Sequence, residues 1–169
     1  MSNEIIERIR RNHALEHATL HVLESQQPNL RAGGRATARG FYLYGDLPDE
    51  ATVRAAADQA IRRLQAGQRD LAVHPRCGTN VVAAGILSGA LALLGIIAGG
   101  RRAPWYVQLP NAILGAMVGA LVAQPLGYWL QANVTTSAAV RGARVRDIRS
   151  RQAGHMAAHF VETDYRSAP

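Results

Sequence analysis

The sequence predicts an α+β fold, in which a small cytoplasmic domain of helices and antiparallel strands carries an inserted transmembrane helical hairpin. Three observations favour this fold. Residues 81–100 and about 109–130 lack charged side chains, and each stretch is long enough to cross a hydrocarbon core of about 30 Å. The residues before them follow helical and strand-like patterns, and those after them have the pattern of a β-hairpin. We therefore expect an α+β segment at 1–77, the hairpin at 78–132, and a β segment at 133–169 that returns to the N-terminal domain.

The chain begins with a predicted amphipathic helix. Ser2 or Asn3 is suited to cap it, and the helix is expected to run to about Gln26 because Pro28 cannot continue it. The glycine pair at 33–34 then predicts a turn, since glycine adopts turn conformations at little cost.

A strand and a second helix follow. Residues 39–44 (RGFYLY) predict a half-buried strand, and residues 71–74 predict a shorter one. Asp46 is expected to cap the second helix, with Pro48 in its first turn and Gly67 at its end. This helix has an apolar stripe at helical spacing, formed by Val53, Ala57, Ala60, Ile61 and Leu64.

The two apolar stretches are predicted to be membrane-spanning helices joined by a short link, RRAPWYVQ. A buried helical pair in a soluble core is the alternative. Pro125 is expected to kink the second helix. Beyond it, residues 144–149 and 156–163 predict a β-hairpin around 152–154. Glycines recur four positions apart in both stretches and permit close helix packing, at Gly85 and Gly89, Gly95 and Gly99, and Gly115 and Gly119.

Charge and composition favour a membrane protein in a reducing compartment. The net charge of the 169 residues is +7, and all 19 basic residues are arginine. Arginine near a membrane is attracted to anionic lipid, so this charge does not by itself indicate nucleic acid, and the bilayer is the expected partner. No nucleic acid is expected. The lone Cys77 excludes an internal disulfide, and the charged N-terminal region does not resemble a signal peptide.

Arginine counts predict the orientation in the membrane. The link contains Arg101 and Arg102. The opposite ends of the two stretches are flanked by more arginines, namely Arg76, Arg141, Arg144, Arg146, Arg149 and Arg151. The positive-inside rule therefore places both termini in the cytoplasm, with the hairpin in a bacterial inner membrane.

Residues 13–17 (HALEH) have the spacing H-x-x-E-H, which lets one helix present two imidazoles to a zinc ion with a carboxylate beside them. At about 100° per residue, His13 and His17 fall on the apolar stripe of the first helix, and Glu16 lies at its edge. An inward imidazole needs a hydrogen-bond partner or a metal. Two interpretations stay open: core histidines satisfied by carbonyl groups and Glu16, or zinc ligands with Glu16 as general base.

His74 and Cys77 are the best candidates for further ligands, because tetrahedral zinc needs more than two. Both precede the first apolar stretch, and Asn80 is suited to orient a ligand or to cap the helix there. Two histidines and a cysteine with an open position would be typical of a catalytic site, whereas three histidines and a cysteine would be typical of a structural one. A simple turn with a buried thiol is the alternative.

Other patterns are weaker. His155 and His159 would share one face of a strand and be half-exposed, with a role as metal ligands as the alternative. The sequence has no phosphate-binding glycine loop, no G-x-S-x-G element and too few carboxylates for a di-iron site. Residues 33–41 (GGRATARGF) are basic and include an aromatic, which is poor support for nucleic-acid binding.

HALEH resembles the signature of the inverted-zincin, or insulinase-type, metallopeptidases. This resemblance implies His13 and His17 as zinc ligands and Glu16 as the base. Those enzymes take a further glutamate about seventy to eighty residues later, where this chain has its first apolar stretch and no acid. Over most of its length the chain more closely resembles a bacterial family of small two-span membrane proteins of unknown function, through RRNHALEHATLHVL, GFYLYGD, LAVHPRCGTN and HFVET.

The leading hypothesis is a zinc-dependent, peptidase-like membrane hydrolase that acts on a protein or peptide near the bilayer surface. Glu16 would be its catalytic base. Its zinc ligands would be His13, His17 and either His74 or Cys77. The alternative is a non-catalytic protein, either an accessory subunit of a membrane complex or a structural metal-binding module. A third hypothesis is a module that binds anionic lipid surfaces through its arginines.

Overall fold

The computed structural model describes residues 2–100, 102–153 and 156–165. Within these residues, four α-helices accompany a four-stranded antiparallel sheet, which confirms the predicted α+β class. The chain divides into two compact units. The sheet unit contains the residues up to His74 and from Gln131 onward, and the hairpin unit contains Pro75–Leu130.

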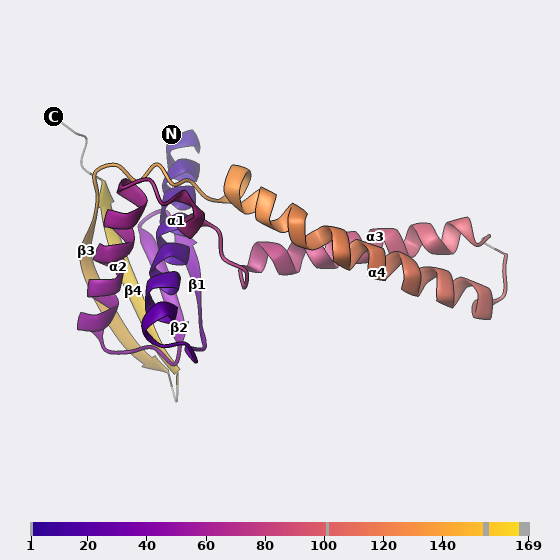
Figure 1. Cartoon of the computed structure of the whole chain (residues 1–169), viewed down its shortest axis with the longest axis horizontal. Coiled ribbons are helices and arrows are strands. Elements are labelled where there is room, and N and C mark those ends of the chain that lie inside the picture. The colour runs from indigo at the N-terminus through magenta and orange to yellow at the C-terminus, as the bar shows by residue number, and fades with distance from the viewer. Residues whose placement is uncertain (1, 101, 154–155, 166–169) are drawn as a thin grey trace. The chain divides into compact units, whose positions relative to one another are not determined.

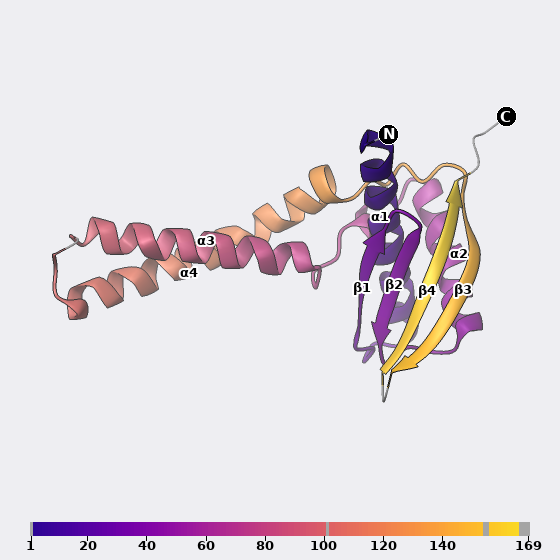
Figure 2. The same ribbon diagram turned by 180° about the vertical axis from the view of Figure 1, so that it is seen from behind.

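The sheet has the strand order β1-β2-β4-β3, with antiparallel neighbours throughout (Figure 2). Its central strands, β2 and β4, are far apart in sequence, yet Phe41 pairs with Val161 and Leu43 pairs with His159. The predicted C-terminal β-hairpin is present, but β3 extends through Ala153 and the residues beyond it, 154–155, lie outside those described. The strands are β1 (Ala32–Thr37), β2 (Gly40–Gly45), β3 (Ala143–Ala153) and β4 (Met156–Tyr165).

Two helices cover one face of this sheet (Figure 1). Along β2, Phe41 and Leu43 are buried, whereas Tyr42 and Tyr44 are exposed, because successive side chains of a strand point to opposite faces. The sheet therefore has one face in the core and one open face. The helices are α1 (Ser2–Gln26) and α2 (Glu50–Gln65). The core between helices and sheet includes Leu15, Leu23, Val53, Ala60, Phe41, Leu43 and Val161.

The side chain of Asn12 joins α1 to two strands of the sheet, β1 and β4. It is 0% exposed, and its Nδ2 donates to the carbonyl oxygen of Thr37 at 2.7 Å. The hydroxyl groups of Thr163 and Tyr165 both donate to its Oδ1, each at 2.7 Å. Burial raises the pKa of Tyr165, so its hydroxyl remains a proton donor at neutral pH. Asn12 thus fixes the rotation of α1 against β1 and β4.

Two local predictions before α2 were wrong. The glycine pair 33–34 lies inside β1 and does not form a turn. A Cβ on Gly34 would lie about 2.6 Å from the carboxyl carbon of Glu16, so the absence of a side chain at Gly34 makes room for Glu16 to pack against β1. Asp49, and not Asp46, caps α2, because its Oδ1 accepts the Thr52 N–H at 2.9 Å.

The predicted strand at 71–74 was also wrong. Residues Arg69–Ala72 form a short 3-10 helix, η1, in which Leu71 and Ala72 are buried. The apolar run that resembled a strand packs into the core from a compact turn, so no sheet partner is required.

The hairpin unit consists of α3 (Gly78–Ala98) and α4 (Trp105–Leu130). Both helices are long and apolar enough to cross a membrane, by length and composition. Both Pro110 and Pro125 lie inside α4.

Glycines allow α3 and α4 to approach each other closely. A Cβ on Gly115 would collide with the carbonyl oxygen of Leu91, and one on Gly95 would collide with that of Asn111. Gly85 instead has open space around its Cβ position. Only some of the glycines predicted to permit packing therefore do so within the hairpin unit.

Asn12→Ala is expected to lower the free energy of unfolding by about 2–4 kcal/mol, because the Thr163 and Tyr165 hydroxyls lose their acceptor inside the core. Urea unfolding of the full chain in detergent, followed by circular dichroism, measures this loss. Asn29→Ala is the matched control, since Asn29 is exposed, and it should change stability by less than about 0.5 kcal/mol. Equal losses in the two variants would contradict the role given to Asn12.

Gly115→Val is expected to destabilise the hairpin unit by about 1–3 kcal/mol, because the added side chain forces the helices apart. Gly85→Val is the matched control and should have a much smaller effect, since its Cβ position is open. Denaturation by sodium dodecyl sulfate, followed by fluorescence of Trp105 and Trp129, measures both. If Gly115→Val unfolds at the same concentration of sodium dodecyl sulfate as the unsubstituted chain, the close packing of α3 and α4 at Gly115 is refuted.

Candidate functional site

Four histidines of the sheet unit form a continuous row of rings. Three of them, His13, His17 and His21, recur every four residues on α1, and the fourth is His74. Ring centroids lie 4.4 Å apart for His13 and His17, 5.7 Å for His17 and His74, and 4.8 Å for His21 and His74. The helical repeat therefore places the two histidines of HALEH side by side, as their spacing predicts.

The apolar stripe predicted for α1 is only partly buried. His17 is 1% exposed and His13 is half-buried, but Ile6 and Ile9 are 56% and 37% exposed. The first turns of α1 project beyond the core, and burial begins near Asn12.

Backbone carbonyl groups orient the two histidines of the motif. Nδ1 of His13 lies 3.0 Å from the carbonyl oxygen of Thr135, and Nδ1 of His17 lies 2.8 Å from that of Ala72. A carbonyl oxygen only accepts, so both Nδ1 atoms carry a proton and the neutral rings have their lone pair at Nε2. Metal-binding histidines commonly donate the second ring N–H to a carbonyl group in this way.

These carbonyl groups come from two segments that lie far apart in sequence. Ala72 ends η1, and Thr135 ends a short π-helical turn, η2 (Gln131–Thr135). Gln131 is fully buried, and its Oε1 accepts the backbone N–H of His74 at 2.8 Å. The two segments are thereby fixed together beside α1.

A second group of potential ligands lies further along α1. One ligand atom each from His21, Glu24 and His74 lies within 4.8 Å of the other two. Nε2 of His74 is 3.1 Å from a carboxylate oxygen of Glu24, and Nε2 of His21 is 2.8 Å from the carbonyl oxygen of Val73. His74 was predicted as a ligand from the sequence, whereas Glu24 was missed and His21 was given no ligand role. Their positions one and two turns after HALEH were the available signal.

Glu16 lies on the side of α1 that faces β1. It is 4% exposed, and its side chain packs over Gly34. The pKa of Tyr44 is raised by burial first, then by Tyr42 and by the nearby Glu16, while Arg35 opposes the shift. The carboxylate is thus buried between α1 and β1, and its role as a base stays a prediction.

Cys77 and Asn80 belong to the hairpin unit. Cys77 is the N-cap of α3, and its Sγ accepts the Thr79 N–H at 3.4 Å. Nδ2 of Asn80 donates to the carbonyl oxygen of Pro75 at 2.8 Å. The roles of Cys77 as a ligand and of Asn80 as an orienting residue stay predictions.

The prediction for His159 was wrong, since its side chain is buried. Nδ1 of His159 is 2.7 Å from the Ser150 hydroxyl, and its Nε2 is 3.0 Å from the carbonyl oxygen of Pro48. Because both ring nitrogens are used, His159 is a structural histidine that fixes the start of α2 to the sheet. His155 lies outside the described residues.

Comparisons with known proteins identify a family and one relative of unknown function. A family model described as a domain of unknown function (DUF6391) matches residues 8–148. An uncharacterised protein of Picosynechococcus sp. strain PCC 7002 is 34% identical over 144 residues, which cover 76% of this chain and 66% of the relative. The chain thus spans just under two thirds of that relative's length. No solved structure matches the chain. Since the family model covers most of the sequence, the chain belongs to the bacterial DUF6391 family, whose function is unknown.

Proposed function

We propose that the chain is an integral protein of the bacterial cytoplasmic membrane, with α3 and α4 as its spans and both termini in the cytoplasm. The length and apolar composition of the two helices support this location. The orientation rests on the arginines, since Arg101 and Arg102 lie in the link and six others flank the opposite ends.

We further propose that His13 and His17 bind one zinc ion through their Nε2 atoms. One observation carries this proposal: both rings donate Nδ1–H to carbonyl oxygens, and their centroids lie 4.4 Å apart. This arrangement presents two neutral imidazoles from adjacent turns of one helix, in the protonation state that zinc requires.

His74 or Cys77 would complete the ligand set. His74 is 2% exposed, and its ring lies beside that of His17 in the histidine row. Cys77 follows it by three positions in the sequence, and a thiolate is a good zinc ligand. Three protein ligands would leave a position for substrate, which is the arrangement of catalytic zinc sites.

The reaction that fits these groups is hydrolysis of an amide bond in a peptide or protein near the bilayer surface. Zinc would supply Lewis acidity that polarises the carbonyl group under attack. Glu16 would accept a proton from the attacking water as the new C–O bond forms. It would then return that proton to the leaving amine as the C–N bond breaks.

A structural metal-binding module is the second candidate. The convergence of His21, Glu24 and His74 within 4.8 Å favours it, because this group contains a buried histidine and a carboxylate already in contact. In that case the metal would hold η1 against α1, and no reaction would follow.

Paired substitutions distinguish the two metal sites. His13→Ala with His17→Ala is expected to reduce bound zinc from about one ion per chain to less than a third. His21→Ala with Glu24→Gln should leave it unchanged. Mass spectrometry of metals in the detergent-purified full chain measures both variants. The reverse pattern would support the structural module, and a zinc content far below one in the unsubstituted protein would exclude both.

Glu16→Gln separates catalysis from metal binding. The nearly isosteric variant should keep its zinc and lose about 10²–10⁴-fold in peptide hydrolysis, since it removes the proton acceptor. Cleavage of a fluorogenic peptide library by the chain in liposomes measures this loss. Glu4→Gln is the matched control, because Glu4 is an exposed acid on the same helix. Hydrolysis that survives Glu16→Gln would contradict the proposed base, and a zinc-loaded chain without hydrolytic activity would favour the non-catalytic candidate.

A further inference from the structure

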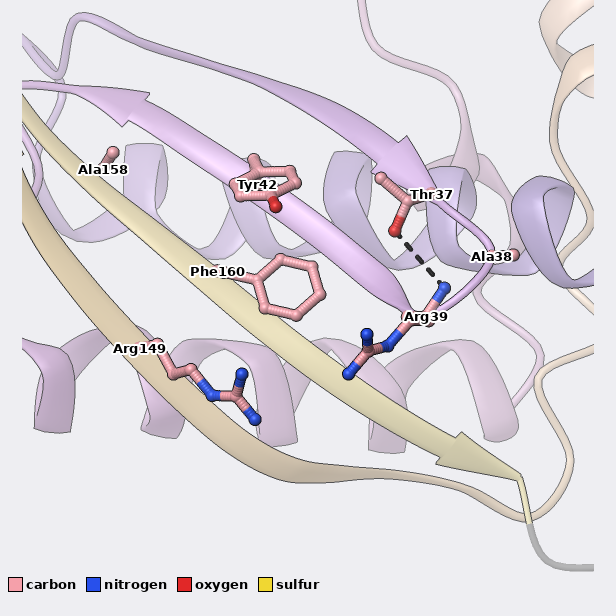
Figure 3. A pocket seen from close by; sticks show the side chains of 7 residues that line it. All are labelled: Thr37, Ala38, Arg39, Tyr42, Arg149, Ala158 and Phe160. Carbon is pink, nitrogen blue, oxygen red and sulfur yellow. Dashed lines mark hydrogen bonds between the residues drawn. The ribbon is translucent and has the colours of Figure 1, made fainter.

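A cavity of about 500 Å³ opens on the face of the sheet opposite α1 and α2. Figure 3 shows its floor, where the rings of Tyr42 on β2 and Phe160 on β4 lie next to each other. Their centroids are 4.6 Å apart, and the two residues are cross-strand partners. Tyr44 extends this row, with its ring 5.9 Å from that of Tyr42 and almost parallel to it. The lining consists of Thr37, Ala38, Arg39, Tyr42, Arg149, Ala158 and Phe160.

Arginines border the rings, and one buried carboxylate positions them. Glu162 has a side chain only 8% exposed, and its oxygens lie 3.0 Å from Arg149 and 3.5 Å from both Arg39 and Arg146. The arginines themselves remain 60–72% exposed, so their guanidinium groups reach solvent. Asp147 also contacts Arg149, at 3.1 Å.

The charge at this face is positive. Glu162 contacts three arginines, and a fourth, Arg35, lies opposite Tyr42 in the strand register. These four arginines outnumber the two acids beside them, Glu162 and Asp147. The turn that carries Arg39 is fixed, since Thr37 Oγ1 accepts the Arg39 N–H at 3.3 Å and donates to the Gly40 carbonyl oxygen at 2.9 Å. Exposed aromatic rings and excess positive charge therefore occur together on a rigid surface.

We propose that this face binds nucleotide units, with a base stacked on Tyr42 and Phe160 and a phosphate held by Arg39 and Arg149. A purely apolar ligand would not require the arginines, and an inorganic anion would not require the rings. A nucleotide combines a flat π-surface with a phosphate, which matches both features. The source is either a free nucleotide or a single strand of nucleic acid.

The expectation from the sequence was that no nucleic acid binds, because the parts of this site are separated along the chain. Residues 39–44 supply one arginine and two tyrosines, whereas Arg149 and Phe160 follow the hairpin. The pairing of β2 with β4 brings them together, and the helices on the other face leave the rings open.

The test measures fluorescence anisotropy of labelled adenosine monophosphate and of a labelled ten-nucleotide RNA, with the full chain in nanodiscs of neutral phosphatidylcholine. Tyr42→Ala with Phe160→Ala is expected to weaken binding at least about tenfold. Arg39→Ala with Arg149→Ala should do the same and reduce the dependence of binding on salt. Arg144→Ala is the control, because Arg144 pairs with Asp164 and does not line the cavity.

The two probes also separate the sources. If the chain binds the RNA and Tyr44→Ala weakens that binding, the ligand is a single strand, since the third ring would stack a further base. If the mononucleotide binds as tightly as the RNA and Tyr44→Ala does not change its affinity, the ligand is a free nucleotide. Failure of both probes to bind the unsubstituted chain would overturn the proposal. Unchanged affinity in the two double variants would overturn it too, as would binding to anionic vesicles that depends on the arginines alone. None of these outcomes depends on zinc or on Glu16.

Discussion

The buried amide of Asn12 fixes how α1 is rotated, and the histidine row depends on that rotation. With Asn12 turned to the sheet, the helical repeat turns His13 and His17 toward the carbonyl groups of η1 and η2. Glu16, one residue before His17, then lies over β1. Because this one side chain donates one hydrogen bond and accepts two in the core, a small rotation of α1 would break all three together.

The candidate site is framed by main-chain groups as much as by side chains. The carbonyl oxygens of Thr135, Ala72 and Val73 each contact one histidine of α1. They belong to the two segments that flank the hairpin in sequence, and the buried Gln131 links these segments. Ring orientation in this protein thus depends on the backbone of the segments that precede and follow the hairpin unit.

Periodic features of the sequence were predictable, and contacts between distant segments were not. The helix that carries HALEH, the two apolar stretches and the C-terminal β-hairpin follow from spacing and composition. Residues 71–74 resembled a strand because a short apolar run has no period to distinguish it from a buried turn. Glu24 and His21 were missed because their partner, His74, lies about fifty residues away. The glycine pair 33–34 was wrongly predicted to form a turn. Gly34 makes room for the side chain of Glu16, which lies eighteen positions earlier, so the local sequence does not show this contact.

The pairing of β2 with β4 sets an order for biosynthesis. As the chain leaves the ribosome, α1, β1, β2 and α2 are made first, but the open edge of β2 has no partner until β4 appears. Both apolar helices are made in that interval, so they are available for membrane insertion before the sheet is complete. An unpaired strand edge invites association with other chains. A delay in completing the hairpin would therefore prolong the time for which the edge of β2 stays unpaired.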